Sequence, residues 1–113
     1  MHEMALAESM LQIVEDAAVT QGFAQVRTIW VEVGSMASVE VAALQFCFEA
    51  VAQDGVAQGA KLEIIEIAGS GYCSSCQRSS PVQSLLDACP ACGAYTMQIT
   101  GGTELRIKEL DVI

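Results

Sequence analysis

Two Cys-x-x-Cys pairs are the residues of this chain whose type and spacing are best suited to chemistry. Cys73 and Cys76 form the first pair, Cys89 and Cys92 form the second, and residues 77–88 separate them. Four thiolates at this spacing can converge on one ion, and Zn(II) accepts a tetrahedral set of sulfur ligands readily. We therefore predict a structural zinc ion on these four cysteines.

A redox dithiol, an iron–sulfur cluster and two disulfides are the alternative uses of these thiols. A thioredoxin-like site needs only one pair, placed between a strand and a helix, and spacing alone leaves a cluster open. The segment has few apolar residues, so a metal ion would be the main organiser of its fold. Four sulfur ligands leave no open position for water, which argues against zinc catalysis. The fifth cysteine, Cys47, lies on an apolar helical stripe and is expected to be a buried thiol.

The start of the chain is the second candidate for chemistry. His2 is the only histidine, and it follows the amine of Met1. That amine, the amide and imidazole nitrogens of His2 and the amide nitrogen of Glu3 could form a planar donor set, which suits Ni(II) or Cu(II). Glu3 and Glu40 also have a structural explanation, because acidic residues in a first turn stabilise a helix. Glu40 would be an auxiliary ligand only if its helix begins beside the N-terminus.

Composition and charge exclude several classes of function. The net charge is −9, and ten acidic residues precede Tyr72 against only two basic ones, Arg27 and Lys61. Such a surface repels phosphate backbones, so nucleic-acid binding is disfavoured. The sequence has no apolar run of the ~20 residues that span a bilayer and no secretory signal pattern, so we expect a cytoplasmic protein. We expect no enzyme activity, because neither a catalytic triad nor a phosphate-binding loop is found.

Hydrophobic periodicity predicts the elements that must position these residues. A helix is expected over residues 3–20, with a stop at Gly22. Its apolar face is expected to be centred on Leu6, Met10, Ile13 and Ala17 and widened by Ala7, Leu11, Val14 and Ala18. A second helix should start at a Ser38 cap and end at residues 54–55. Strands are expected over residues 26–33, 61–68 and 103–112. Residues 69–71 read as a flexible hinge, and the cysteine segment is then an insertion between two strands.

Several segments together resemble the HypA/HybF family of hydrogenase nickel-insertion metallochaperones, and the resemblance covers nearly the whole chain. They are the opening Met1-His2-Glu3, residues 29–34, 39–40, 43–49 and 56–62, the two cysteine pairs, and residues 102–107. An initial Met-His-Glu combined with a late inserted double Cys-x-x-Cys motif is much more specific than either feature alone. Gln77 departs from the family pattern, which often has glycine after the first pair.

The resemblance implies an α+β fold in which two helices pack on a small three-stranded sheet. This would be a nickel-binding domain of residues 1–71 and 100–113, with an inserted zinc-ribbon-like module of residues 72–99 that carries the four cysteines. Ni(II) would be the transported ion, bound by His2 and neighbouring main-chain nitrogens, and Zn(II) the structural ion. The implied partners are a maturation GTPase and the precursor of a [NiFe] hydrogenase large subunit, and some family members also serve urease maturation. A homodimer is a further candidate assembly, although the sequence does not determine the oligomeric state.

The alternative function is a zinc-ribbon module for protein interaction that has no role with nickel. The acidic charge and the single basic residue between the first and last cysteine, Arg78, argue against nucleic acid as its partner. A nickel titration of the untagged chain separates the alternative from the nickel carrier.

Overall fold

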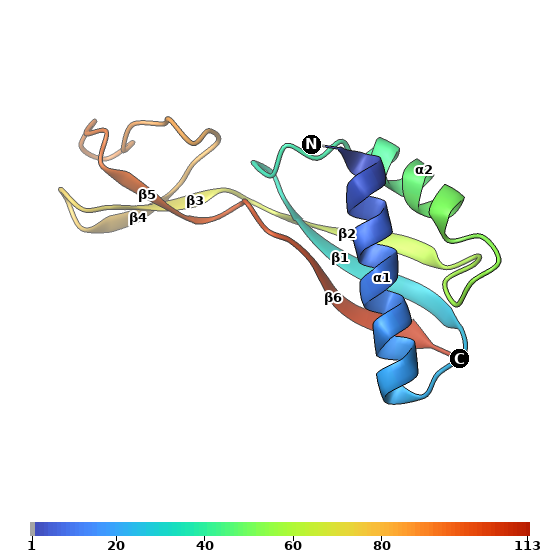
Figure 1. The fold of residues 1–113 in the computed structure, drawn as a ribbon. Helices are drawn as coiled ribbons and strands as arrows, with labels where there is room; N and C mark the ends of the chain where they lie inside the picture. Colours follow the sequence, from blue (N-terminus) through green and yellow to red (C-terminus); the bar gives the residue numbers. More distant parts are fainter. Residues whose placement is uncertain (1) are drawn as a thin grey trace. The chain divides into compact units, whose positions relative to one another are not determined.

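The computed structural model describes residues 2–113, which form two helices and six strands (Figure 1). In chain order these are α1 (Glu3–Gln21), β1 (Val26–Gly34), α2 (Val41–Val51), β2 (Lys61–Ile67), β3 (Ser70–Cys73), β4 (Arg78–Pro81), β5 (Met97–Gly101) and β6 (Leu105–Val112). The strands form two three-stranded sheets, ordered β2-β1-β6 and β4-β3-β5. The predicted α+β class is confirmed. The second sheet, inside the cysteine segment, was not predicted.

The chain divides into two compact units. The helical unit comprises Met1–Val31, Val39–Ile64 and Ile107–Ile113. The cysteine unit comprises Glu32–Ser38 and Ile65–Arg106. Within the described residues 2–113, neither helix is both long and apolar enough to cross a membrane.

Helix α1 ends where the sequence predicts. Gly22 adopts the left-handed conformation with φ 76°, which glycine reaches without steric cost, and its amide closes the last turn. The buried face of the helix consists of Ala7, Met10 and Val14. Ile13 was expected on that face, but it is 56% exposed. The buried stripe therefore lies toward the Ala7 and Val14 edge of the predicted face.

Helix α2 has a different N-terminal cap from the one expected. The N-cap residue is Glu40, whose side chain accepts a hydrogen bond of 3.0 Å from the amide of Ala42. This bond satisfies one of the amide groups that a helix start leaves without an intrahelical partner. Ser38 was predicted as the cap, but it lies two residues upstream with φ 59°.

The core of the helical unit is aliphatic. Its largest fully buried side chains come from α1, β1 and α2, and they are Val14, Val26, Ile29, Val31 and Leu44. The two helices contact each other, and Figure 1 shows α1 lying across the β2-β1-β6 sheet. Cys47 on α2 was expected to be buried but is only half-buried. The buried face of α2 consists of Leu44 and Phe48, and Cys47 lies at the edge of that face.

The cysteine unit is built on close backbone contacts. Strand β3 lies between β4 and β5 and is antiparallel to both. A Cβ atom on Gly34 would come within 2.1 Å of the carbonyl group of Gly102, and one on Gly69 within 2.1 Å of the Val82 carbonyl oxygen. These positions therefore require glycine. The predicted hinge at residues 69–71 is wrong, since Ser70 already belongs to β3 and Gly69 is closely packed.

Candidate metal centre

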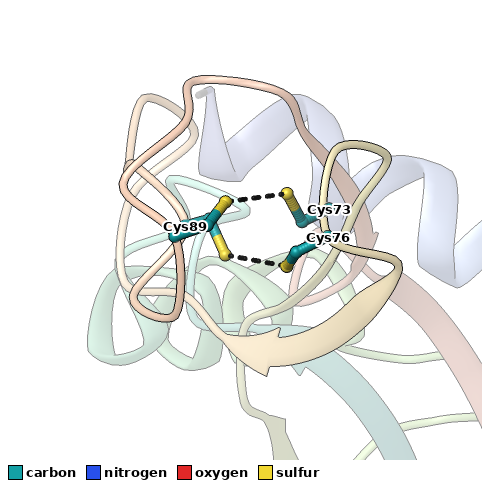
Figure 2. Close-up of side chains that lie close together, drawn as sticks. Cys73, Cys76 and Cys89 are labelled. Carbon is teal, nitrogen blue, oxygen red and sulfur yellow. Dashed lines mark hydrogen bonds between the residues drawn. The ribbon is translucent and has the colours of Figure 1, made fainter.

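The four cysteines lie at one end of the β4-β3-β5 sheet. Cys73 is the last residue of β3, and Cys76 lies in the turn that leads to β4. Cys89 and Cys92 lie in the segment between β4 and β5. Figure 2 shows Cys73 and Cys76 pointing toward Cys89 from the opposite side of the site. The fold thus brings together all four cysteines that the sequence analysis singled out.

The two cysteine pairs are held by equivalent turns. In the first, the amide of Gln77 donates to the carbonyl of Cys73 at 2.8 Å, and in the second, the amide of Gly93 donates to that of Cys89 at 2.8 Å. Both residues after the pairs are left-handed, with φ 57° at Gln77 and φ 77° at Gly93. Gln77 keeps this turn at the steric cost of a side chain in the left-handed conformation, a cost that Gly93 does not have.

The sulfur positions fit one tetrahedral metal ion. All four Sγ atoms lie within 4.8 Å of one another. The Sγ–Sγ distance is 3.7 Å between Cys73 and Cys92 and 3.7 Å between Cys76 and Cys89. A zinc–sulfur bond of about 2.3 Å in tetrahedral geometry separates its sulfurs by about 3.8 Å. Zn(II) would therefore fit at the centre of the four sulfurs without rearrangement of the two turns.

The same distances exclude disulfides in this structure. A disulfide requires its two sulfurs about 2.05 Å apart, and all five cysteines of the chain are free thiols. Within the described residues 2–113, the four clustered cysteines are the only group of three or more potential ligands close enough to hold a metal ion.

The electrostatics of the four thiols favour a bound cation. Hydrogen bonds, first from the Thr96 hydroxyl and then from the Cys76 amide, lower the pKa of Cys73 to about 6. Burial and the neighbouring thiols, Cys89 first among them, raise the pKa of Cys76 to about 12. Four sulfur anions this close together repel one another, so they cannot all ionise without a positive charge between them. A divalent cation removes that conflict and releases the remaining thiol protons.

The four ligand positions are not equivalent. Cys73 and Cys89 are buried, Cys76 is half-buried and Cys92 is exposed. Cys73 also has a hydroxyl neighbour, because Thr96 Oγ1 lies 3.3 Å from its Sγ. The sequence analysis missed Thr96. No local pattern marks it, since 23 residues separate it from Cys73 and only the pairing of β3 with β5 brings the two segments together.

The other candidate residues lie in the helical unit. His2 is exposed and occupies the N-cap position of α1 in an extended conformation, with φ −85° and ψ 98°. Glu3 is the first residue of α1, and its carboxylate accepts a hydrogen bond of 3.4 Å from the amide of Glu40. The start of α2 therefore lies beside the start of α1. Met1, the proposed source of the amine ligand, lies outside the described residues.

Nearly the whole chain is similar to one family of known proteins. The family model described as "Hydrogenase/urease nickel incorporation, metallochaperone, hypA" matches residues 1–112. A hydrogenase maturation factor HypA from Albidiferax ferrireducens is 51% identical over 112 residues, which are 99% of each chain. The protein of the same name from Azotobacter vinelandii is 48% identical over the same share.

Two solved structures share the fold. A structure described as the solution structure of HypA protein matches with a TM-score of 0.77 at 22% identity, covering 100% of this chain and 97% of the other. The solution structure of the Ni metallochaperone HypA from Helicobacter pylori matches with a TM-score of 0.74 at 21% identity, covering 100% and 98%. At this level of identity the two structures establish the fold alone.

Proposed function

We propose that this chain, which belongs to the HypA family of hydrogenase/urease nickel incorporation metallochaperones, binds Ni(II) at its N-terminus and delivers it during the maturation of [NiFe] hydrogenase. The observation that carries the proposal is the match to a nickel-incorporation family over residues 1–112. The exposed histidine at the start of α1 is the feature of the fold that supports a terminal site, because an exposed site can pass its ion to a partner.

The proposed nickel ligands are the Met1 amine, the amide and imidazole nitrogens of His2 and the amide nitrogen of Glu3. The helix supports this set, because the first amide groups of a helix have no intrahelical acceptor and Glu3 is the first residue of α1. Its amide nitrogen is therefore available to an ion. Nitrogen donors in one plane match the square-planar preference of Ni(II).

Glu40 is proposed as an auxiliary group rather than a main ligand. Its backbone lies within hydrogen-bonding distance of the Glu3 carboxylate, which supports a position near the proposed nickel site. One oxygen of its own carboxylate already accepts a bond from Ala42. Only the other oxygen would be open to a weak contact with the ion.

Zn(II) is proposed as the resident structural ion, held by Cys73, Cys76, Cys89 and Cys92. The sulfur spacing supports it, and four thiolates close the coordination sphere against water. A closed site has no position for a substrate, so we propose that the protein is a carrier and not an enzyme. The zinc would hold the segment around the two cysteine pairs in its fold.

The remaining assignments are proposals of the same kind. We place the nickel-binding domain at residues 1–71 and 100–113 and the inserted zinc module at residues 72–99. The family context gives partners in hydrogenase maturation. Among them we propose a maturation GTPase and the large-subunit precursor, with urease maturation proteins and a homodimer as further assemblies. The compartment we propose is the cytoplasm.

Nickel binding to the untagged chain tests the proposal. The wild-type chain should bind about one Ni(II), and His2→Ala should lose that binding, because it removes the only imidazole of the chain. One residue added before Met1 should have the same effect, since it moves the amine away. Zinc content and helical circular dichroism should stay unchanged in both variants. Normal nickel affinity in His2→Ala would overturn the terminal site.

Two substitutions at Glu3 distinguish the contribution of its main-chain amide to nickel binding from that of its side chain. Glu3→Pro removes the amide hydrogen, while proline suits the first position of a helix and the extended His2 suits a following proline. This variant should therefore keep α1 and lose nickel. Glu3→Gln keeps the amide and should bind nickel like the wild type. Equal nickel binding by Glu3→Pro and wild type would exclude the amide of residue 3 as a ligand.

A further inference from the structure

Two hydroxyl groups form a short row that ends on a cysteine sulfur. Ser75 Oγ lies 2.9 Å from Thr96 Oγ1, and Thr96 Oγ1 lies 3.3 Å from Cys73 Sγ. Cys73 is fully buried, so little water can reach its sulfur. The Thr96 hydroxyl takes the place of water as the hydrogen-bond donor there.

The chemistry of a zinc ligand fixes the direction of both hydrogen bonds. A thiolate that binds a metal has no proton, so it can only accept a hydrogen bond. Thr96 must then donate its proton to Cys73 Sγ, which leaves the Thr96 oxygen free to accept from the Ser75 hydroxyl. A donor to a thiolate spreads its negative charge and fixes its orientation.

We infer that Thr96, oriented by Ser75, is the positioning residue that secures Cys73 as the most firmly held ligand of the zinc site. The inference rests on the proposed zinc assignment and adds to it an order among the four ligands. Among residues 2–113, the sulfurs of Cys89 and Cys92 have thiols but no hydroxyl as side-chain hydrogen-bond partners. Pro90 and Ala91, which stand between these two cysteines, carry no hydroxyl that could replace Ser75. At the other end of this order is Cys92, whose side chain is exposed.

The backbone of Thr96 is held independently of its hydroxyl group. Both the amide and the hydroxyl of Ser74 donate to the carbonyl oxygen of Thr96, each at 3.5 Å. Valine has the shape of threonine and the same β-branch, so Thr96→Val should keep these two bonds and the local backbone geometry just before β5. The substitution therefore removes the proton donor and little else.

The affinity of the chain for zinc, measured by competition with a chelator, tests the inference. Loss of an outer-shell partner of a metal ligand typically weakens metal affinity by about 10- to 100-fold, and Thr96→Val should fall in this range. Ser75→Ala should lose less, because Thr96 can still donate. The double variant should match Thr96→Val alone, since Ser75 acts only through Thr96.

The same sheet provides a matched control. Ser70 Oγ and Thr100 Oγ1 lie 3.0 Å apart, and Ser70 and Thr100 belong to β3 and β5. This pair is of the same type but has no sulfur neighbour among its hydrogen-bond partners. Thr100→Val should therefore leave zinc affinity unchanged, and Thr96→Ser should retain most of the wild-type affinity because it keeps the hydroxyl.

Substitution of cobalt for zinc gives a spectroscopic readout that a purely structural role would not affect. Removal of the hydrogen bond raises the energy of the Cys73 sulfur electrons, so the sulfur-to-cobalt charge-transfer band of Thr96→Val should move to longer wavelength. Thr96→Ser and Thr100→Val should keep the wild-type band.

The outcomes separate this inference from the zinc assignment. Zinc binding of equal affinity by wild type and Thr96→Val would overturn the inference alone. An equal loss in Thr96→Val and Thr100→Val would also overturn it, because the effect would then be one of sheet stability. A wild-type chain that binds no zinc would overturn the zinc assignment as well.

Discussion

The helical unit and the cysteine unit of this protein are stabilised in different ways. Of the fourteen buried apolar residues among residues 2–113, ten belong to the helical unit. The four in the cysteine unit are Val33, Cys73, Val82 and Cys89, and two of these are proposed zinc ligands. The helical unit can therefore depend on hydrophobic burial, whereas the cysteine unit must depend on a metal ion and on its backbone hydrogen bonds.

Removal of zinc should reveal this difference most strongly. Structural zinc contributes about 10–16 kcal/mol of apparent binding free energy in small zinc modules, far more than one buried valine. Chelation, or Cys89→Ser, should therefore unfold the region of residues 70–101 and leave α1 and α2 folded. Amide resonances resolved by residue provide the measurement.

Cys47→Ser is the control for zinc removal. It removes the cysteine on α2 that lies outside the cluster. Zinc content should therefore stay unchanged, and the amide resonances of residues 70–101 and of the two helices should keep their wild-type positions. Well-dispersed amide resonances from residues 70–101 in a metal-free chain would show that the cysteine unit folds without a metal ion, and would contradict this prediction.

A substitution in the hydrophobic core should destabilise the helical unit and leave the cysteine unit folded. Leu44 on α2 is fully buried, and truncation of such a leucine to alanine costs about 2–5 kcal/mol. Leu44→Ala should therefore lower the free energy of unfolding of the helical unit by that amount while the chain still holds its zinc. Denaturant unfolding combined with metal analysis measures both quantities.

Phe46 provides the matched control on the same helix. Its side chain is 73% exposed, so Phe46→Ala should change the free energy of unfolding by no more than about 0.5 kcal/mol. Loss of zinc in Leu44→Ala would show that the two units do not separate as their cores suggest.

The same contrast explains which parts of the fold the sequence could predict. The extents of α1, β1, β2 and β6 follow from apolar periodicity, because burial on one face produces the regular spacing. The cysteine cluster follows from ligand spacing. Strand β4, with the sequence Arg-Ser-Ser-Pro over Arg78–Pro81, has neither signal. It exists because it pairs with β3, and pairing between distant segments leaves no local pattern.

The details that were missed depend on contacts of the same long-range kind. Ser38 has the right residue type for a helix cap, but Glu40 takes the position, and its amide also meets the Glu3 carboxylate across 37 residues. The contact of Thr96 with Cys73 spans 23 residues. Gly34 and Gly102 look like turn residues in the sequence, yet Gly34 is required because two backbone segments touch there.

The smallest expected effect concerns the turn between β5 and β6. Glu104 accepts a hydrogen bond of 2.6 Å from the amide of Gly102. Hydrogen bonds from backbone amides, its own first and that of Gly102 next, lower the pKa of the Glu104 carboxyl. A lowered pKa in the folded state means that the unfolded chain takes up protons first as the pH falls. The stabilisation by Glu104 is therefore complete above the ordinary glutamate pKa of about 4.3 and is lost below it.

Unfolding measured against pH compares the wild type with Glu104→Gln. The difference in stability should be constant between about pH 6 and 8 and should shrink below about pH 4. Glu109→Gln, which removes an exposed carboxylate from β6, controls for the change in net charge. If the difference persisted unchanged in acid, the carboxylate would not be what holds this turn. The cysteine unit would then depend at this point on the close contact of Gly102 with its neighbours, and the metal ion would carry a larger share of its stability.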